Sequence, residues 1–262
     1  MRYFDIFLAK AGKYEACGLF NFKHLVLILI TCGGVLYALG KTRKKSKDEI
    51  QKIIKYSTII LWVFEIFRIV FRMVNGEITA FESYLPLYYC SLLLYAGLLS
   101  SFAKGKFKRM GDIFLATGGI IGGIIFILFP STTLPTYPMM HFMSLHSFVY
   151  HGIMVYIGIL VNITNYVEYD KSDIMYYARL VGTLCVVVLF VNHITGSNLM
   201  FISREFPGTL GKVAGGLFGR LYTPMMAIIH MFAPFYAVCT IKNLMVKRVL
   251  HLLEAESKFA GN

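Results

Sequence analysis

One cysteine of this chain lies among polar and aromatic side chains inside an otherwise apolar segment. In the run YLPLYYCSLLLY, Cys90 follows Pro86, Tyr88 and Tyr89 and precedes Ser91. A thiol becomes a nucleophile only beside a group that can take its proton. The sequence therefore offers Cys90 as a candidate nucleophile, and the plainer alternative is a small packing residue of a membrane helix.

The segment HFMSLHSFVYHG supplies imidazoles that could accept such a proton. His141, His146 and His151 follow one another at steps of five residues. Five residues turn a helix by about 500°, so neighbouring histidines point about 140° apart and do not make the i, i+4 metal pair of a single helix. Either His151 or His146 could serve Cys90 as a base, and the alternative is a hydrogen bond between helices.

Three charged side chains share one face of another apolar segment. Glu65, Arg68 and Arg72 stand at i, i+3 and i+7, with Glu65 and Arg68 close enough to pair. A charge at the centre of a membrane helix costs about 2.5 to 3.5 kcal/mol, so such residues are rare and often functional. They could bind a phosphate headgroup or a carboxylate, and the alternative is an internal salt bridge.

Two asparagines lie near the end of a later apolar segment, in the run VNHITGSNLMF. The side-chain amides of Asn192 and Asn198 could orient an imidazole or donate to an oxyanion, as amides do in acyl transfer. They could equally belong to a helix cap that ends at Gly196.

The elements that must position these groups are membrane helices. Of the 262 residues, 57% are apolar and 15% are charged. A globule of this size has too little interior for so much apolar surface, which excludes a soluble enzyme and a disordered chain. The cysteines form no CxxC pair, so neither disulfides nor zinc are suggested, and no metal or cofactor is expected. They are Cys17, Cys32, Cys90, Cys185 and Cys239.

Hydropathy predicts an all-α, polytopic protein with about seven transmembrane helices. The expected spans are 24–39, 56–74, 84–102, 113–129, 142–164, 175–194 and 223–241. Residues 1–23 would then be an extracellular segment, 24–241 the transmembrane domain and 242–262 a cytoplasmic tail.

The basic residues predict the orientation of these spans. Alternate loops carry 17 Lys and Arg at one end and seven at the other, and two of the 26 lie inside a span. The positive-inside rule then places the N-terminus outside and the C-terminus in the cytoplasm of a multi-pass protein of the cell membrane. Topology and contact with anionic lipid explain the net charge of +12, so no nucleic-acid partner is expected.

Several short motifs resemble those of one known family. The run LPLYYC, which ends at Cys90, resembles the LPLHLC motif of the YwaF-type bacterial integral membrane proteins, whose animal relatives are the transmembrane protein 164 lipid acyltransferases. Tyr137-Pro138 and His151-Gly152 resemble the family's FP and HG pattern, and residues 192–200 resemble its N-x-x-x-G-x-N-x-M segment. The motifs occur in the family's order, and seven spans match its topology.

The resemblance implies a cysteine-dependent transacylase, because the animal members are understood to move a fatty acyl chain from a phospholipid onto a lyso-ether-phosphatidylethanolamine. Carried over, it makes Cys90 the nucleophile that holds the acyl group as a thioester and His151 the general base. Tyr88 stands where the family pattern has His, so any role of that His is absent or modified here.

The leading hypothesis is therefore a lipid acyltransferase whose partners are membrane phospholipids and lysophospholipids. Its catalytic pair is Cys90 and His151. The supporting residues are His146, Asn192, Asn198 and Tyr88, and the headgroup-binding residues are Glu65, Arg68 and Arg72.

The main alternative is a transporter or channel in which the same polar side chains line a path for a small polar or anionic solute. A third interpretation is a passive structural or assembly protein, for which substitution of Cys90 or His151 would be silent.

Overall fold

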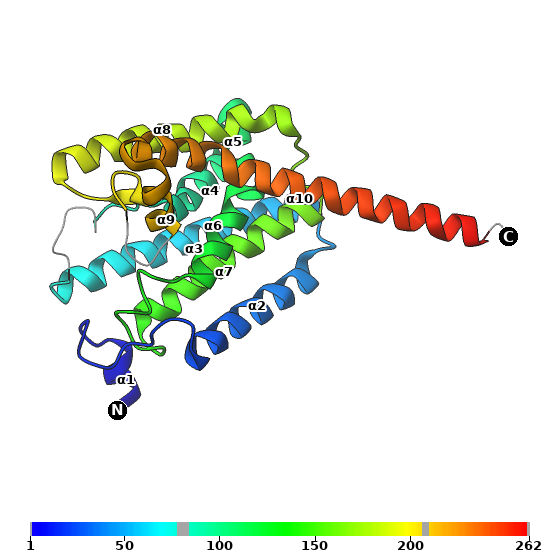
Figure 1. Cartoon of the computed structure of the whole chain (residues 1–262). Coiled ribbons are helices and arrows are strands. Elements are labelled where there is room, and N and C mark those ends of the chain that lie inside the picture. Colours follow the sequence, from blue (N-terminus) through cyan, green and yellow to red (C-terminus); the bar gives the residue numbers. More distant parts are fainter. Residues whose placement is uncertain (1, 78–83, 206–209, 261–262) are drawn as a thin grey trace.

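The chain folds into a bundle of helices in the computed structural model, which confirms the predicted all-α class (Figure 1). The structure describes residues 2–77, 84–205 and 210–260, and none of these residues forms a strand. Within these described ranges, five helical segments are long and apolar enough to cross a membrane. They are Phe22–Thr42, Gly105–Leu128, Phe142–Ile163, Lys171–Thr195 and Lys212–Met245.

The helices follow one another along the chain with short connections. The α-helices are α1 (Arg2–Phe7), α2 (Phe22–Thr42), α3 (Lys47–Val74), α4 (Leu92–Phe102), α5 (Gly105–Ala116), α6 (Gly118–Leu128), α7 (Phe142–Ile163), α8 (Ile174–Thr195), α9 (Leu210–Phe218) and α10 (Tyr222–Ala260). Short 3-10 turns are η2 (Tyr89–Ser91), η3 (Lys171–Asp173), η4 (Leu199–Phe201) and η5 (Gly219–Leu221).

Each of the seven predicted spans falls on a helical segment, but only five meet the length and hydropathy expected of a span. Helix α3 is long enough and carries charged residues within it, and the apolar segment Tyr89–Phe102 is shorter. The count of seven and the orientation stay predictions. Residues 242–260, predicted as part of a separate tail, continue α10.

Helix α3 begins nine residues earlier than its predicted span, at Lys47, because a capping box starts it. The Ser46 side chain accepts a hydrogen bond from the Glu49 N–H at 3.3 Å, and the Glu49 carboxylate accepts one from the Ser46 N–H at 2.9 Å. These reciprocal bonds satisfy two donors that a helix start leaves free.

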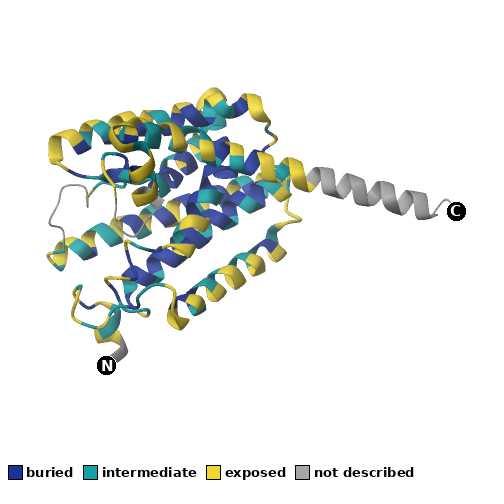
Figure 2. Ribbon diagram, viewed as in Figure 1, coloured by how far each residue is buried: buried dark blue, intermediate teal, exposed yellow. Residues whose placement is uncertain are grey.

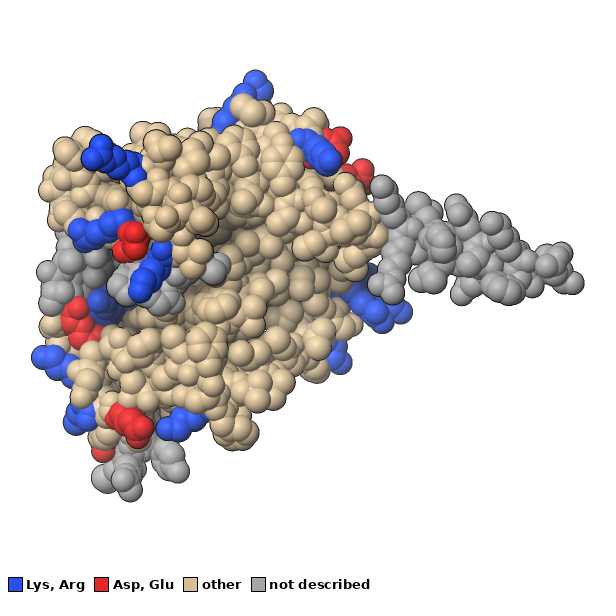
Figure 3. Space-filling view, in the orientation of Figure 1, with Lys and Arg blue, Asp and Glu red and all other residues tan. Residues whose placement is uncertain are grey.

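The most deeply buried helix is α7, which packs against α2, α3, α5 and α6 (Figure 2). Helices α2 and α8 lie at the outside and expose large apolar side chains such as Leu36 and Phe190. Charged side chains on the face shown in Figure 3 lie mostly toward the two ends of the bundle, with a largely uncharged band between them. Exposed apolar surface between charged ends is what a lipid environment requires.

The predicted fourth span was expected to be one continuous helix, but it is broken at Thr117. The Thr117 backbone leaves the helical region, with φ −127° and ψ −79°, and separates α5 from α6. A Cβ added to Gly118 would lie 2.6 Å from the hydroxyl of Tyr89 and 2.8 Å from that of Tyr177. The break therefore brings a glycine-lined stretch of α6 against Tyr89, the residue before Cys90.

Gly122→Ala is expected to destabilise the protein because it would disturb the packing of α6 against Tyr89. The new Cβ would lie 2.9 Å from the Met154 methyl group and 3.0 Å from the Tyr89 ring. The methyl group can move, but the Tyr89 hydroxyl is held 2.6 Å from that of Tyr177. Overpacking costs about 1 to 3 kcal/mol, which at least offsets and over most of that range exceeds the gain of about 1 kcal/mol from removing a helical glycine.

Thermal unfolding in one detergent measures this change, with Gly34→Ala in α2 as the matched control. A Cβ at Gly34 meets no atom within 4 Å, so the control should unfold at the wild-type temperature or slightly above it. Equal unfolding temperatures for the two variants would show that Tyr89 is not packed against α6 as described.

The N-terminal segment is pinned against the loop that leads into α7. The N–H of Cys17 donates to the Tyr137 carbonyl and that of Gly18 to the Leu134 carbonyl, both at 2.9 Å. The Nε2–H of His141 donates to the Ala9 carbonyl at 2.8 Å. Since a carbonyl only accepts, the ring holds its proton on Nε2, and its Nδ1 accepts from the Met143 N–H at 3.0 Å.

Stability is expected to fall as the pH drops below about 6.5, in part because of His141. Burial lowers the pKa of His141 below its ordinary value, against weaker opposing effects of the hydrogen bond to the Ala9 carbonyl and of the nearby Glu77 carboxylate. An unfolded His takes up a proton near pH 6.5, where the buried ring still resists it, so acid favours the unfolded chain. The stabilisation is complete above that pH and is lost as the pH falls toward the folded pKa.

Melting temperatures measured between pH 7.5 and 5.5 check this dependence. His141→Gln should flatten the slope, whereas His193→Gln, a change at an exposed position, should keep it. A slope unchanged in His141→Gln would assign the acid sensitivity to other groups.

Candidate active site

Cys90 lies in the 3-10 turn η2, at the beginning of α4. The structure therefore corrects the predicted third span, which placed this residue about six positions inside a helix. Tyr88 is extended, with φ −79° and ψ 162°, and the first turn follows it. The Cys90 side chain is half-buried, and the N-terminal end of a helix is a favourable place for a negative group.

A buried ion pair on α3 lies within electrostatic range of the Cys90 thiol. Arg68 donates from Nε to Glu65 Oε2 at 2.9 Å and from Nη2 to Glu65 Oε1 at 2.6 Å. The Glu65 residue is 5% exposed. These two bonds confirm the predicted pairing of Glu65 and Arg68, and both groups interact electrostatically with Cys90.

Tyr150 on α7 links its helix to the turn η2 and to the ion pair on α3. Its hydroxyl donates to the Cys90 carbonyl at 3.2 Å, and it interacts electrostatically with Glu65 and Arg68. Tyr150 was not among the site residues predicted from the sequence. Its position one turn after His146, on the same helical face, was the available signal.

His146 lies on the side of α7 that faces the ion pair. It is buried, its ring centroid is 6.0 Å from that of Tyr150, and it interacts electrostatically with both Glu65 and Arg68. Its Nε2 atom is buried without a hydrogen-bond partner among the residues that the structure describes. His146 thus belongs to the polar group around Cys90 through the ion pair.

His151 is held in one orientation by its neighbours. Its ring stacks on Phe126, with centroids 3.6 Å apart and planes 7° apart, and its Nδ1–H donates to the Ser147 carbonyl at 2.7 Å. The proton therefore sits on Nδ1, and Nε2 carries a lone pair. Within the described part of the chain that Nε2 is buried and has no partner, and no hydrogen bond joins either imidazole to Cys90.

Arg72 and Tyr88 lie at the edge of this group. Arg72 Nη2 donates to the Glu77 carbonyl at 3.2 Å, and so ties the end of α3 to the following turn. The Tyr88 ring packs against that of Phe201, with centroids 5.9 Å apart. Through that contact the loop after α8 touches the turn that carries Cys90.

Asn192 and Asn198 stabilise the loop after α8 through hydrogen bonds. Asn192 accepts from the Leu199 N–H at 2.8 Å and donates to the Leu199 carbonyl and to Ser203 Oγ. Asn198 accepts from the N–H groups of Ser203 and Arg204 and donates to the Arg204 carbonyl.

Their bonds hold a strained turn. Met200 and Phe201 have φ of 56° and 52°, which non-glycine residues seldom adopt. A pocket of about 330 Å³ adjoins the turn and is lined in part by Asn192, His193 and Arg204. None of the amide bonds described here reaches Cys90, so an oxyanion role for the asparagines stays a prediction.

Among the described residues, no group of three or more His, Cys, Asp or Glu side chains is arranged to hold a metal ion. The polar groups that the structure gathers around Cys90 are Tyr150, the Glu65–Arg68 pair and, through that pair, His146.

Comparison with known proteins supports the family resemblance. The TMEM164 family model matches residues 19–243, a stretch that contains Glu65, Cys90, His151 and Asn198. No curated protein sequence and no solved structure matches the chain. Because the match covers most of the chain, the protein belongs to the TMEM164 family of membrane proteins.

Proposed function

We propose that this protein transfers fatty acyl chains between a phospholipid and a lysophospholipid through a thioester on Cys90. The observation that carries the proposal is the position of Cys90 at the start of a helix in a membrane protein, where Tyr150 donates to its carbonyl and the buried Glu65–Arg68 pair is within electrostatic range. Family membership supports it. We place the protein in the cell membrane, with the N-terminus outside.

The reaction consists of two acyl transfers that balance in atoms and protons. An imidazole takes the proton of the Cys90 thiol, and the thiolate attacks the ester carbonyl of the donor phospholipid. The C–O bond breaks, the lysophospholipid leaves with the proton, and a thioester remains. The hydroxyl of a second lysophospholipid then gives its proton to the imidazole and attacks the thioester, which restores the thiol.

His151 is the base that we assign to these steps. Its Nδ1–H is engaged by the Ser147 carbonyl, so Nε2 is the basic atom, and no described protein group occupies it. His146 also has a free Nε2 and lies closer to the charged pair.

The histidine variants therefore form a matched test. His151→Gln is expected to slow acyl transfer by about 10² to 10⁴, the usual contribution of a general base, and His146→Gln to slow it less. The rate of acyl transfer in reconstituted vesicles measures both. A larger loss in His146→Gln would move the role of base to that residue.

Arg68 would bind the donor headgroup. A guanidinium has five N–H donors, and the pair with Glu65 uses two of them, which leaves donors for a phosphate oxygen. Glu65 would hold the guanidinium in a fixed orientation.

Detection of the thioester tests the proposal directly. The protein is reconstituted in vesicles of phosphatidylethanolamine with an isotope-labelled acyl chain, and peptides are analysed by mass spectrometry. The label should appear on the peptide of Cys90 but not on that of Cys185, and neutral hydroxylamine should remove it. Acyl transfer without any label on Cys90 would contradict the proposal.

One observation favours the second candidate, a transporter. Helices broken in mid-membrane often line the substrate sites of transporters, and the fourth predicted span is broken at Thr117. The break is filled by Tyr89 and Tyr177, which argues for packing. Flux of a small anion into the same vesicles, without thioester formation, would favour the transporter.

A further inference from the structure

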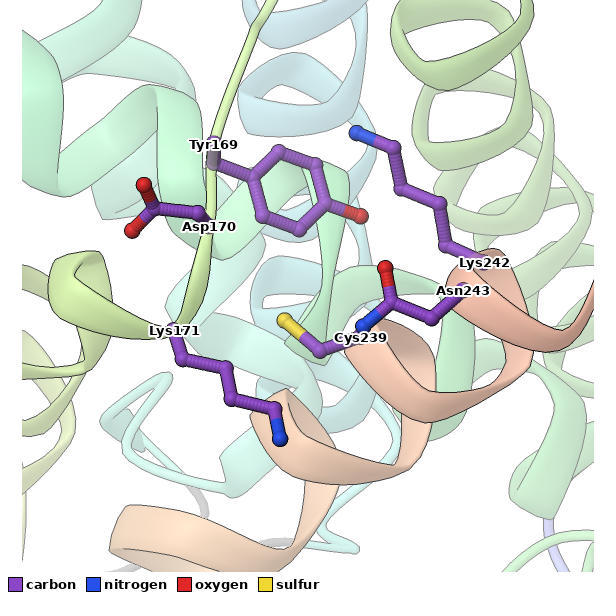
Figure 4. Close-up of a pocket in the computed structure, with 6 residues that line it drawn as sticks. All are labelled: Tyr169, Asp170, Lys171, Cys239, Lys242 and Asn243. Carbon is purple, nitrogen blue, oxygen red and sulfur yellow. The ribbon is translucent and has the colours of Figure 1, made fainter. Parts of the chain in front are cut away.

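A pocket of about 310 Å³ lies between the chain that leads into α8 and the middle of α10 (Figure 4). It is at the end of α7 that is predicted to face the cytoplasm. The residues that line it are Tyr169, Asp170, Lys171, Cys239, Lys242 and Asn243.

One cation of this pocket is held in place by an aromatic ring. The Lys242 ammonium lies 4.1 Å from the centroid of the Tyr169 ring, within the range of a cation–π interaction. The Tyr169 hydroxyl donates to Asn162 Oδ1 at 2.7 Å, which fixes the ring against α7. Lys242 is therefore positioned before any ligand arrives.

The remaining charges leave the pocket positive. Among the described residues neither Lys171 nor Lys242 forms an ion pair, and Asp173 is paired with Arg109 at 2.7 Å. The Asp170 carboxylate accepts hydrogen bonds from the N–H and the hydroxyl of Ser172, and it points away from the side on which Asn243 and Cys239 lie (Figure 4).

The donors that remain could receive the phosphate of a headgroup that spans the pocket. The lining residues come from two separate elements, with the Lys242 ammonium beside the Tyr169 ring, the Lys171 ammonium at the opposite side of the pocket and the Asn243 amide between them (Figure 4). Lysine binds phosphate as a point charge, and basic pockets between membrane helices hold lipid headgroups.

Exposed apolar residues within four positions of the lining residues in the sequence indicate where the phosphate would come from. Ile241, Leu244 and Met245 on α10 and Met175 on α8 are each more than half exposed. A lipid whose headgroup occupied the pocket would lay its acyl chains against these side chains, whereas a free phosphate would leave them uncovered. We propose that the pocket binds the phosphate of an anionic phospholipid from the leaflet at this end of the bundle.

The site is separate from the group around Cys90. Tyr150, which contacts the Cys90 carbonyl, and Asn162, which holds Tyr169, are twelve residues apart on α7, or about 18 Å along the axis. Lipid binding at this pocket is therefore independent of the proposed acyl transfer. A variant that loses lipid binding should keep acyl transfer, and a variant that loses acyl transfer should keep lipid binding.

Native mass spectrometry of the full-length protein tests the inference. Detergent-solubilised protein is titrated with equimolar dioleoylphosphatidylglycerol and dioleoylphosphatidylcholine, and the two lipid adducts are compared. Each lysine near a surface anion contributes about a factor of five, or roughly 1 kcal/mol at 1.4 kcal/mol per tenfold. The double variant Lys171→Gln/Lys242→Gln should therefore lower the preference for the anionic lipid by about 25-fold.

The control is Lys104→Gln/Lys106→Gln, which removes the same charge at two exposed positions outside the pocket. This control should keep the wild-type preference, and all three proteins should unfold at one temperature. Equal losses in both double variants, or no preference in the wild type, would overturn the inference. Displacement of the lipid by millimolar inorganic phosphate would overturn the lipid as the occupant and assign the pocket to the free ion.

Discussion

Cys90→Ser protein is expected to lose acyl transfer by roughly 10³-fold or more, with its fold intact, because removal of a covalent nucleophile is among the costliest changes an enzyme can undergo. The serine hydroxyl fits the space of the half-buried thiol but holds its proton far more tightly. The measurement is the transfer of labelled acyl chains to lysophospholipid in reconstituted vesicles.

Two other cysteines serve as controls for this variant. Cys185→Ser alters a buried thiol within α8, and Cys32→Ser alters an exposed thiol on α2. Both should retain transfer near the wild-type rate. If Cys90→Ser protein, with an unchanged unfolding temperature, transfers acyl chains as fast as these controls, Cys90 is not the nucleophile.

Glu65→Gln is expected to lower the free energy of unfolding by about 3 to 5 kcal/mol, since removing one partner of a buried ion pair leaves the other charge uncompensated. The side chain of Arg68 is 17% exposed and that of Glu65 is 6% exposed, so water offers little relief. The substitution also removes the negative charge that strengthens the two hydrogen bonds from Arg68, at 2.9 and 2.6 Å. Reversible unfolding in a denaturing detergent measures the effect.

A second variant separates the unpaired charge from the loss of packing. Glu65→Gln/Arg68→Met removes both charges and should recover most of the lost stability, because a buried pair and an apolar replacement are often close in energy. Glu49→Gln, which breaks the exposed pair with Lys45, should change the stability much less. If the double variant is as unstable as Glu65→Gln, the cost lies in packing and not in charge.

Hydropathy predicted where the helical segments lie because each segment must satisfy its own backbone and present apolar side chains to lipid. It missed the break at Thr117, since a run of glycine and isoleucine is equally apolar whether the helix continues or stops. The early start of α3 was missed for a related reason. The capping box at Ser46 acts through hydrogen bonds, which a hydropathy profile does not detect.

The spacing of Glu65 and Arg68 predicted their pairing because both lie on one helix, where sequence distance fixes the distance in space. The contact between Tyr150 and Cys90 joins residues sixty positions apart, and only the packing of α7 against η2 determines it. Arg72 shows the limit of the helical argument. It shares the face of Glu65 but lies at the end of α3, where its guanidinium binds the Glu77 carbonyl.

The pinned N-terminal segment has a consequence for the order in which the chain folds during synthesis. Ala9 is bonded to His141, and Cys17 to Tyr137, so these partners leave the ribosome more than a hundred residues apart. Closing so long a loop must wait until α7 begins to emerge. Until then the N-terminal segment can bond only to earlier parts of the chain, as Ala11 does to Glu77, and its contacts with the loop before α7 form only after more than half of the protein has been made.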